Sequence, residues 1–151
     1  MLHYRGCGLD NVWLRNGYEE TETPYGSGVT IHNLTELHDA IGRAIVNSLQ
    51  PINGAEAKFL RQELELSQAM LANLLGRDEQ AVARWEKGRS KRVDPLADRL
   101  IRILYRETKM DGQLKPIMEM LRQIEAVPGR ERKFVVYESD DSWIARQEKA
   151  A

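Results

Sequence analysis

The stretch Phe59–Gly88, FLRQELELSQAMLANLLGRDEQAVARWEKG, decides how this chain folds. Its apolar residues recur at helical spacing, with a polar turn in the middle. Ser67 can cap a first helix, and Gly76 can end it in the left-handed conformation. Asp78 can then cap a second helix, which Gly88 ends. We therefore predict two short helices joined by a tight turn.

The apolar side chains of this stretch explain how the two helices would pack. They are Leu66, Leu71, Ala72, Leu75, Val82 and Trp85. Ala72 is small, which lets the helices cross closely at that point. Val82 and Trp85 lie three residues apart, so they can anchor one face of the second helix and leave the other face exposed. This arrangement is typical of a helix-turn-helix, whose second helix enters the DNA major groove.

With these residues in place, the sequence resembles the Cro/XRE family of phage-repressor-like DNA-binding domains. The resemblance rests on Leu60-Arg61-x-x-Leu64-x-Leu66-Ser67-Gln68-x-x-Leu71-Ala72-x-x-Leu75-Gly76, followed by Val82-x-Arg84-Trp85-Glu86-x-Gly88. It covers residues 55–109 and implies a five-helix domain. This part of the chain is also similar to the DNA-binding half of MqsA-type antitoxins. Those proteins carry a CxxC zinc module ahead of it, and this sequence has no CxxC.

The resemblance also implies roles for individual residues. The base-contacting residues would be Glu79, Gln80, Ala81 and Arg84, and the phosphate-contacting residues would be Gln68, Lys87, Arg89, Lys91 and Arg92. The Gln80 amide can pair with adenine, the Arg84 guanidinium with guanine, and Glu79 can accept from cytosine N4. Gln68 can in addition brace the recognition helix. If about five phosphates are neutralised per protomer, a dimer gives a salt slope near −9.

Signals on either side of this stretch predict the remaining elements. Apolar residues at helical spacing predict a helix that begins at Asn33 and ends before Pro51. These apolar residues are Leu34, Leu37, Ile41, Ile45 and Leu49. A second face of the same helix consists of small residues that would allow close packing, namely Ala40, Ala44 and Ser48. Asn53 and Glu56 form a capping box for the next helix, with Phe59, Leu60 and Leu64 on its apolar side. Asp94-Pro95 starts another that runs to about Thr108, with the stripe Leu96, Leu100, Ile103 and Leu104. A fifth helix falls within Gly112–Ala126.

The two ends of the chain favour β structure. Strand-like stretches are Asn11–Glu19, Gly28–His32 and Lys133–Glu138, and Asn16-Gly17 is a hairpin turn signal. Trp143 and Ile144 are expected to be buried. We predict a mainly α protein with a small antiparallel β element formed from the chain ends. The expected divisions are 1–52 (β-rich segment plus helix), 53–109 (helix-turn-helix domain) and 110–151 (helix and strand, for dimerisation or core completion).

Composition narrows the class of protein. The chain has 151 residues, 22 basic and 23 acidic side chains, and one cysteine. The charge is segregated, at −3 for residues 1–54, +3 for 55–109 and −1 for 110–151. No apolar run approaches the roughly 20 residues of a membrane span. The N-terminus does not show the pattern of a secretory signal, so we expect a cytoplasmic protein without disulfides or a Cys-pair zinc site.

The residues that could carry metal or catalytic chemistry do not form a recognisable site. His3, Cys7, His32 and His38 match no standard zinc spacing, and surface histidines explain them better. Cys7 has no identifiable base that would make it a nucleophile. Acidic residues of the N-terminal region, Asp10, Glu19, Glu20 and Glu22, can bind a metal or a basic partner, although a solvated face is the simpler explanation. We therefore predict neither an enzyme nor a cofactor.

The predicted function is that of a sequence-specific, dimeric transcriptional repressor that binds double-stranded DNA as a homodimer, with no membrane partner. Its recognition helix would span residues 78–87. The alternative is an antitoxin that represses its own operon and binds a protein toxin, for which the acidic N-terminal region suits a basic partner. A third hypothesis is a nucleic-acid enzyme that uses the helix-turn-helix for targeting and the N-terminal carboxylates with His32 or His38 for metal.

Overall fold

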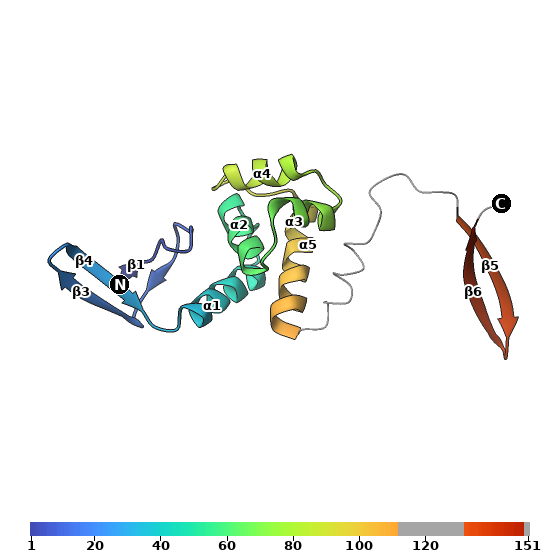
Figure 1. The fold of residues 1–151 in the computed structure, drawn as a ribbon, viewed down its shortest axis with the longest axis horizontal. Helices are drawn as coiled ribbons and strands as arrows, with labels where there is room; N and C mark the ends of the chain where they lie inside the picture. The colour runs from blue at the N-terminus through green and yellow to red at the C-terminus, as the bar shows by residue number, and fades with distance from the viewer. Residues whose placement is uncertain (112–131, 150–151) are drawn as a thin grey trace.

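The computed structural model describes residues 1–111 and 132–149, which contain five α-helices and three two-stranded antiparallel sheets. The helices are α1 (Leu34–Asn47), α2 (Gly54–Glu63), α3 (Gln68–Leu75), α4 (Glu79–Lys87) and α5 (Pro95–Tyr105), which continues into the π-helical turn η1 (Arg106–Asp111). The strands are β1 (Leu2–His3), β2 (Trp13–Leu14), β3 (Tyr18–Thr23), β4 (Gly26–Ile31), β5 (Arg132–Ser139) and β6 (Ser142–Lys149). Figure 1 shows α1–α5 packed into one helical body, so the mainly α prediction holds at this level.

The β structure does not join the two ends of the chain as predicted. Strand β1 pairs with β2, β3 with β4, and β5 with β6, always antiparallel. Each strand therefore pairs with its neighbour in sequence: β3–β4 and β5–β6 close through two-residue turns, whereas residues 4–12 separate β1 from β2. The predicted strand 133–138 is confirmed as part of β5, and the predicted strand 28–32 lies largely within β4.

The hairpin turn of the N-terminal region is not at Asn16-Gly17. Register pairs Thr23 with Gly26, so Pro24-Tyr25 forms the two-residue turn between β3 and β4. Gly17 has a positive φ of 81°, as its turn signal requires, but the bend there leads from β2 into β3, which do not pair. Its carbonyl accepts from His32 N at 2.9 Å and so closes the base of the β3–β4 hairpin.

Helix α1 is shorter than predicted, and only the middle of its predicted apolar stripe packs inward: Ile45 is buried and Ile41 packs against the core, while Leu34 is exposed. It ends at Asn47, and Leu49 is fully exposed beyond it. The predicted small-residue face is wrong, because Ala40 and Ala44 are exposed. Gly42 makes the close approach instead: a Cβ there would lie 2.1 Å from the Tyr105 hydroxyl. Only glycine lets α1 pack this tightly against α5.

The predicted caps of the middle helices are confirmed. Asn53 and Glu56 form a complete capping box at α2, with both bonds near 3 Å. The Ser67 side chain accepts from Met70 N at the start of α3. Gly76 ends that helix with a φ of 67°, in the left-handed region. These bonds satisfy backbone donors that the first helical turn leaves unpaired.

Helix α5 is turned relative to the predicted stripe. Leu96 and Ile103, expected to be buried, are 66% and 50% exposed. Leu104 is buried as predicted, and the rest of the buried side consists of Ala97, Asp98, Ile101 and Tyr105. A carboxylate at the centre of the buried side misleads a hydrophobic pattern, because charged residues are normally expected outside. The predicted helix in 112–126 lies outside the described residues.

The core is formed mainly by the helical body. Its most deeply buried large side chains are Leu9, Ile52, Leu60, Leu71, Val82, Ile101 and Tyr105. Leu9 comes from the N-terminal segment, which is also tied on by side chains. The Tyr4 hydroxyl hydrogen-bonds His38 Nε2 at 2.9 Å, and His38 Nδ1 lies 3.1 Å from Glu63 Oε1. Residues 4–12 are therefore part of the same packed unit as the helices.

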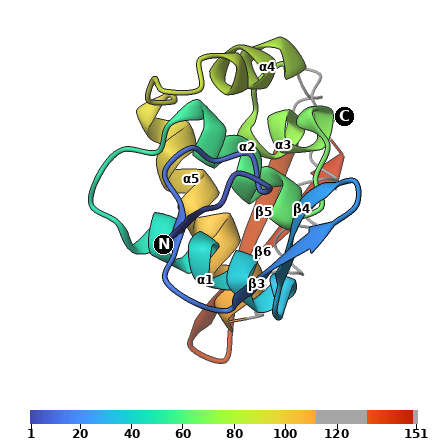
Figure 2. The same cartoon turned by 90° about the vertical axis from the view of Figure 1, so that its left-hand side faces the viewer.

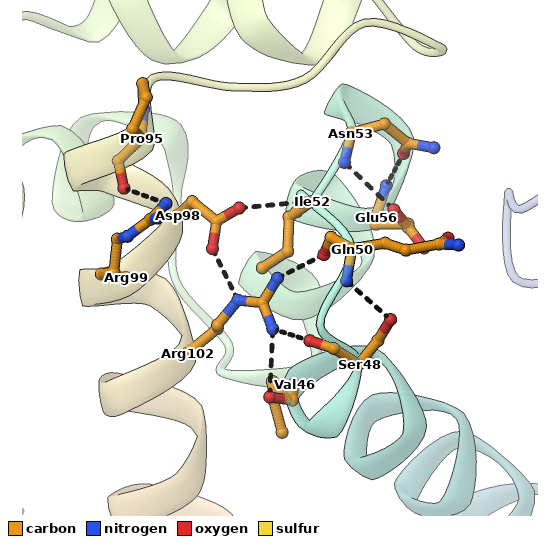
Figure 3. Close-up of polar contacts among 10 residues, drawn as sticks. All are labelled: Val46, Ser48, Gln50, Ile52, Asn53, Glu56, Pro95, Asp98, Arg99 and Arg102. Carbon is orange, nitrogen blue, oxygen red and sulfur yellow. Dashed lines mark hydrogen bonds and ion pairs between the residues drawn. The ribbon is translucent and has the colours of Figure 1, made fainter.

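Arg102 connects α5 to the end of α1 (Figure 3). Asp98 is 2% exposed, and its carboxylate accepts from Arg102 Nε at 2.5 Å and from Ile52 N at 2.8 Å. The Arg102 guanidinium also donates to the backbone carbonyls of Val46, Ser48 and Gln50. These carbonyls lie at and beyond the C-terminal end of α1, where helix carbonyls have no intrahelical partner.

The β5–β6 hairpin leaves large apolar side chains exposed. Trp143 and Ile144 are 72% and 40% exposed, so the expectation that both are buried is wrong. Among the residues that the structure describes, none of the helices combines the length and the apolar character needed to span a membrane.

Candidate nucleic-acid interface

Helix α4 lies along one edge of the helical body in both Figure 1 and Figure 2. Its inward side consists of Ala81, Val82 and Glu86, all buried. Its outward side carries Glu79, Gln80, Arg84 and Lys87, all exposed. The Asp78 side chain accepts from Ala81 N at 2.7 Å and fixes the start of the helix. The structure thus presents a short, capped helix with a polar outer face.

A groove runs beside this outer face. It has a volume of about 560 Å³ and is lined by Lys58, Gln68, Gln80, Ala83, Arg84, Glu86, Lys87 and Arg89. Five predicted DNA-contacting residues therefore meet in one concavity, although they come from α3, α4 and the segment after α4. Lys58 of α2 adds a cation that the sequence analysis did not identify. Four basic side chains on a concave surface favour a polyanionic ligand.

Beneath the groove, Glu86 is paired with Arg61. The two side chains make a bidentate ion pair, with Arg61 Nε and Nη2 donating to the two carboxylate oxygens at 2.7 and 2.8 Å. Arg61 Nη1 also donates to the Leu66 carbonyl, and Gln68 Nε2 donates to Glu86 Oε1 at 3.2 Å. Both charged side chains are nearly buried. The predicted brace from Gln68 to α4 is therefore present, and it acts through Glu86.

This pairing also changes the electrostatics of the surface. From sequence, Glu86 is the one acidic residue among the basic residues of 84–92. In the structure its charge is compensated inside by Arg61, so it does little to offset Arg84 and Lys87 outside. Within the described residues, neither Arg84 nor Lys87 forms an ion pair.

Arg89 is held by the N-terminal segment. Its guanidinium donates to the Gly8 carbonyl at 2.8 Å and to Asp10 Oδ2 at 3.0 Å. The hydrogen bond and charge of Arg89 lower the pKa of Asp10 below its ordinary value. Arg89 is 48% exposed as a side chain, so it still borders the groove, but a carboxylate already occupies part of its hydrogen-bonding capacity.

The basic segment after α4 is fixed through its backbone. The carbonyls of Arg89 and Lys91 accept from Ala55 N and Gly54 N at 3.1 and 3.0 Å. Val93 N donates to the Ile52 carbonyl, and Arg92 forms a bridge with Asn53. The start of α2 thus holds residues 89–93, while the Lys91 and Arg92 side chains remain exposed.

Not every residue that was predicted to contact DNA is exposed on the surface. Ala81 is only 6% exposed, because it lies on the side of α4 that packs against the body. We therefore remove Ala81 from the predicted base-contacting set. Glu79 is exposed at the first position of α4, and Lys91 and Arg92 lie beyond the groove lining.

Two important residues were not assigned roles from sequence. Lys58 lies ten residues before Gln68, and Arg61 lies 25 residues before its partner Glu86. No local periodicity connects such positions. Among the described residues, no group of three or more His, Cys, Asp or Glu side chains is arranged to hold a metal ion.

Comparison with known proteins places the chain in no family. No protein-family model matches it, and no curated protein and no solved structure gives a significant match.

Proposed function

We propose that this protein is a sequence-specific DNA-binding transcriptional repressor that acts as a dimer. In this proposal α3 and α4 are the two helices of a helix-turn-helix, and α4 enters the major groove. Site occupancy alone can block transcription, so the mechanism requires no catalysis.

The observation that carries the proposal is the outer face of α4 beside a basic groove. Gln80 and Arg84 lie four residues apart and therefore on the same side of the helix. Their side chains have the donors and acceptors that distinguish adenine and guanine in the major groove. They are exposed, and the residues between them and the body are apolar or internally paired. A polar outer face is normal for a surface helix, so what favours a DNA contact is the position of this face beside a groove lined by four basic side chains.

The surrounding cations fit the role of phosphate contacts. Lys58 and Lys87 line the groove, and Lys91 and Arg92 extend the basic surface past the end of α4. Because Arg89 is engaged by Asp10, we count four phosphate contacts per protomer. Eight contacts in a dimer give a salt slope of about −7, less steep than the value of about −9 expected from sequence alone.

The first test is a titration of the purified protein against the DNA upstream of its own gene. Fluorescence anisotropy at two salt concentrations, with random DNA as competitor, separates specific from non-specific binding. We expect binding that survives the competitor and a footprint with two-fold symmetry. Equal affinity for both DNAs would contradict the proposal.

Arg84→Ala tests the base contact directly. It should weaken specific binding by about 1–3 kcal/mol and relax the preference at one base pair. Lys91→Ala should instead weaken binding to all DNA and reduce the salt slope by about 1 per protomer. Arg99→Ala is the matched control, because Arg99 is an exposed arginine of α5 outside the groove. If Arg84→Ala affected random and specific DNA equally, the base-contacting role would be wrong.

A second candidate function, an antitoxin, is favoured by the β3–β4 hairpin. Glu19, Glu20 and Glu22 are all exposed on β3, which gives the protein an acidic edge that DNA binding does not use. A basic toxin encoded by a neighbouring gene would suit this edge. Co-expression with that gene product should give a stable complex, and changing the three glutamates to glutamine should weaken it. A neighbouring product that fails to bind would remove this candidate while leaving the repressor proposal intact.

A further inference from the structure

We propose that a small polar cavity beside the basic groove binds an oxyanion, the phosphate or carboxylate group of a small metabolite, and that this anion competes with DNA. The competition rests on the proposed function, because it concerns the DNA contact. The binding of the anion needs no DNA and can be tested alone.

The cavity lies between the N-terminal segment and α2. It has a volume of about 220 Å³ and is lined in part by residues 6–8, by Lys58 and Gln62 of α2, and by Arg89. Pockets for drug-sized ligands measure about 300–1,000 Å³, so this cavity is sized for a smaller molecule. Its walls are anchored, because Phe59 belongs to the core and Cys7 packs against that core.

The charged side chains that line the cavity are basic. Lys58 and Arg89 come from different parts of the chain, and among the described residues no acidic side chain lines the cavity with them. Lys58 is exposed and forms no ion pair within the described part of the chain. Two cations at one small concavity favour an anion there.

Arg89 is held in place and still has donors to offer. Its hydrogen bonds to the Gly8 carbonyl and to the Asp10 carboxylate are both made by Nη2. Its backbone carbonyl accepts from Ala55 N, which fixes the residue against α2. Asp10 therefore orients the guanidinium, while the N–H groups on Nε and Nη1 have no partner within the described residues. A guanidinium with remaining donors matches the geometry of phosphate and carboxylate oxygens.

Neutral amide groups complete the lining. Gln62 lies four residues after Lys58, so the two side chains share one side of α2. Within the described residues, the backbone N–H groups of Gly6 and Cys7 have no hydrogen-bond partner. Successive backbone N–H groups in a turn can hold an anion. The cavity thus combines charge with uncharged donors, as an oxyanion requires.

Two residues belong to both the cavity and the basic groove. They are Lys58 and Arg89. In the proposed function Lys58 contacts a DNA phosphate, so an anion that occupies its ammonium group removes about one phosphate contact per protomer. Coupling between two ligands is reciprocal, so DNA weakens anion binding as much as the anion weakens DNA binding. The protein would release its operator when the anion accumulates.

Alkylation of Cys7 tests the site in the absence of DNA. Cys7 is the one cysteine of the chain, and it lines the cavity. Its reaction with iodoacetamide, a neutral reagent, is followed by mass spectrometry with inorganic phosphate or acetate, against sodium chloride at equal ionic strength. A bound anion should slow the reaction about tenfold once it is present at ten times its Kd. The anion that protects Cys7 identifies the chemistry of the ligand, and protection by neither would overturn the proposal.

Two exposed residues give a matched pair of variants. Gln62 lines the cavity but not the groove, and Lys87 lines the groove but not the cavity. Gln62→Glu places a carboxylate of similar size in the cavity and should abolish the protection of Cys7. Lys87→Gln removes a nearby positive charge and should leave the protection intact. Loss of protection in both variants, or in neither, would show that the anion does not bind in this cavity.

Fluorescence anisotropy then tests the competition. At constant ionic strength, the protecting anion should weaken DNA binding about 5–10-fold in the wild-type protein and leave it unchanged in Gln62→Glu. A protected Cys7 together with unchanged DNA affinity would overturn the competition. If the anion-free protein failed to bind DNA specifically, the proposed function would be wrong, while the alkylation result would still decide whether the cavity binds an anion.

Discussion

The helical body contains two buried arginine–carboxylate pairs that hold its elements in different ways. Under α4, Arg61 and Glu86 join side chain to side chain, with one further bond to a backbone carbonyl. Between α1 and α5, the pair of Arg102 and Asp98 binds the backbone at four places (Figure 3). The first pair positions a helix that faces outward, and the second joins the chain segments on which the body depends. Substitutions at the two pairs should therefore have different consequences.

The largest effect is expected at the α1–α5 pair. Asp98→Ala removes the acceptor of Ile52 N and leaves the Arg102 guanidinium without its carboxylate. Loss of one partner of a buried pair destabilises by about 3–5 kcal/mol. Chemical denaturation should show this loss in the free energy of unfolding. The DNA affinity of the folded fraction should be unchanged, because the groove does not include this pair. Asp98→Asn, which keeps an acceptor for Ile52, should lose less, and an unchanged unfolding midpoint for Asp98→Ala would contradict the comparison.

A smaller loss of stability is expected at the α4 pair. Glu86→Ala should destabilise by about 3 kcal/mol, because Arg61 retains the Leu66 carbonyl. It should also weaken DNA binding, since α4 loses its link to α2 and α3. Measuring stability and affinity on the same sample separates the two effects. A Glu86→Ala protein that binds DNA normally would show that the pair does not position α4.

The Asp10–Arg89 contact allows a sharper test at the edge of the groove. Asp10→Asn frees Arg89 for a phosphate, so affinity for all DNA should rise and the salt slope should steepen by about 1 per protomer. Because Arg89 lowers the pKa of Asp10, the pair is present above the ordinary pKa of the carboxyl and is lost as the pH falls through the lowered value. Glu20→Gln removes the same charge away from Arg89 and should leave the slope unchanged.

The smallest effect is expected at Tyr105. Its hydroxyl is buried without a hydrogen-bond partner among the described residues. Tyr105→Phe should therefore leave stability unchanged or raise it by up to about 1 kcal/mol. Burial raises the pKa of Tyr105 to about 12 from an ordinary 10.0. The wild-type protein should consequently lose stability between pH 10 and 12, where the unfolded phenol ionises first, and the variant should lose less. Identical pH profiles would contradict this.

Features encoded by neighbouring residues were predictable from sequence. The caps at Asn53, Ser67 and Asp78 join groups three residues apart, so the sequence within one helical turn contains both partners. The same holds for Gly76, whose conformation ends α3. Most of the candidate interface follows from these signals, because they define where α4 begins and which side of it is apolar.

Features that depend on distant residues were not predictable. The partners Arg61 and Glu86 are 25 residues apart, and Arg89 and Asp10 are 79 apart. The Asp98–Arg102 ion pair also explains why the buried side of α5 was predicted incorrectly. Asp98 is buried because Arg102 compensates its charge, whereas a hydrophobic pattern assigns such a carboxylate to the surface. The available cations at the groove could therefore be identified only after the internal pairs were known.

The close contact between the start of α2 and the end of α4 has a consequence for how this protein can evolve. A Cβ on Gly54 would lie 1.9 Å from the Trp85 carbonyl oxygen and 3.0 Å from that of Gly88. Even alanine would push α4 outward, whereas the side chains on the outer face of α4 meet no such restriction. Under the proposed function, selection for a new target sequence can therefore exchange Gln80 or Arg84 while Gly54 stays invariant. Alignments of diverged copies should show this as one fixed glycine beside a hypervariable helix.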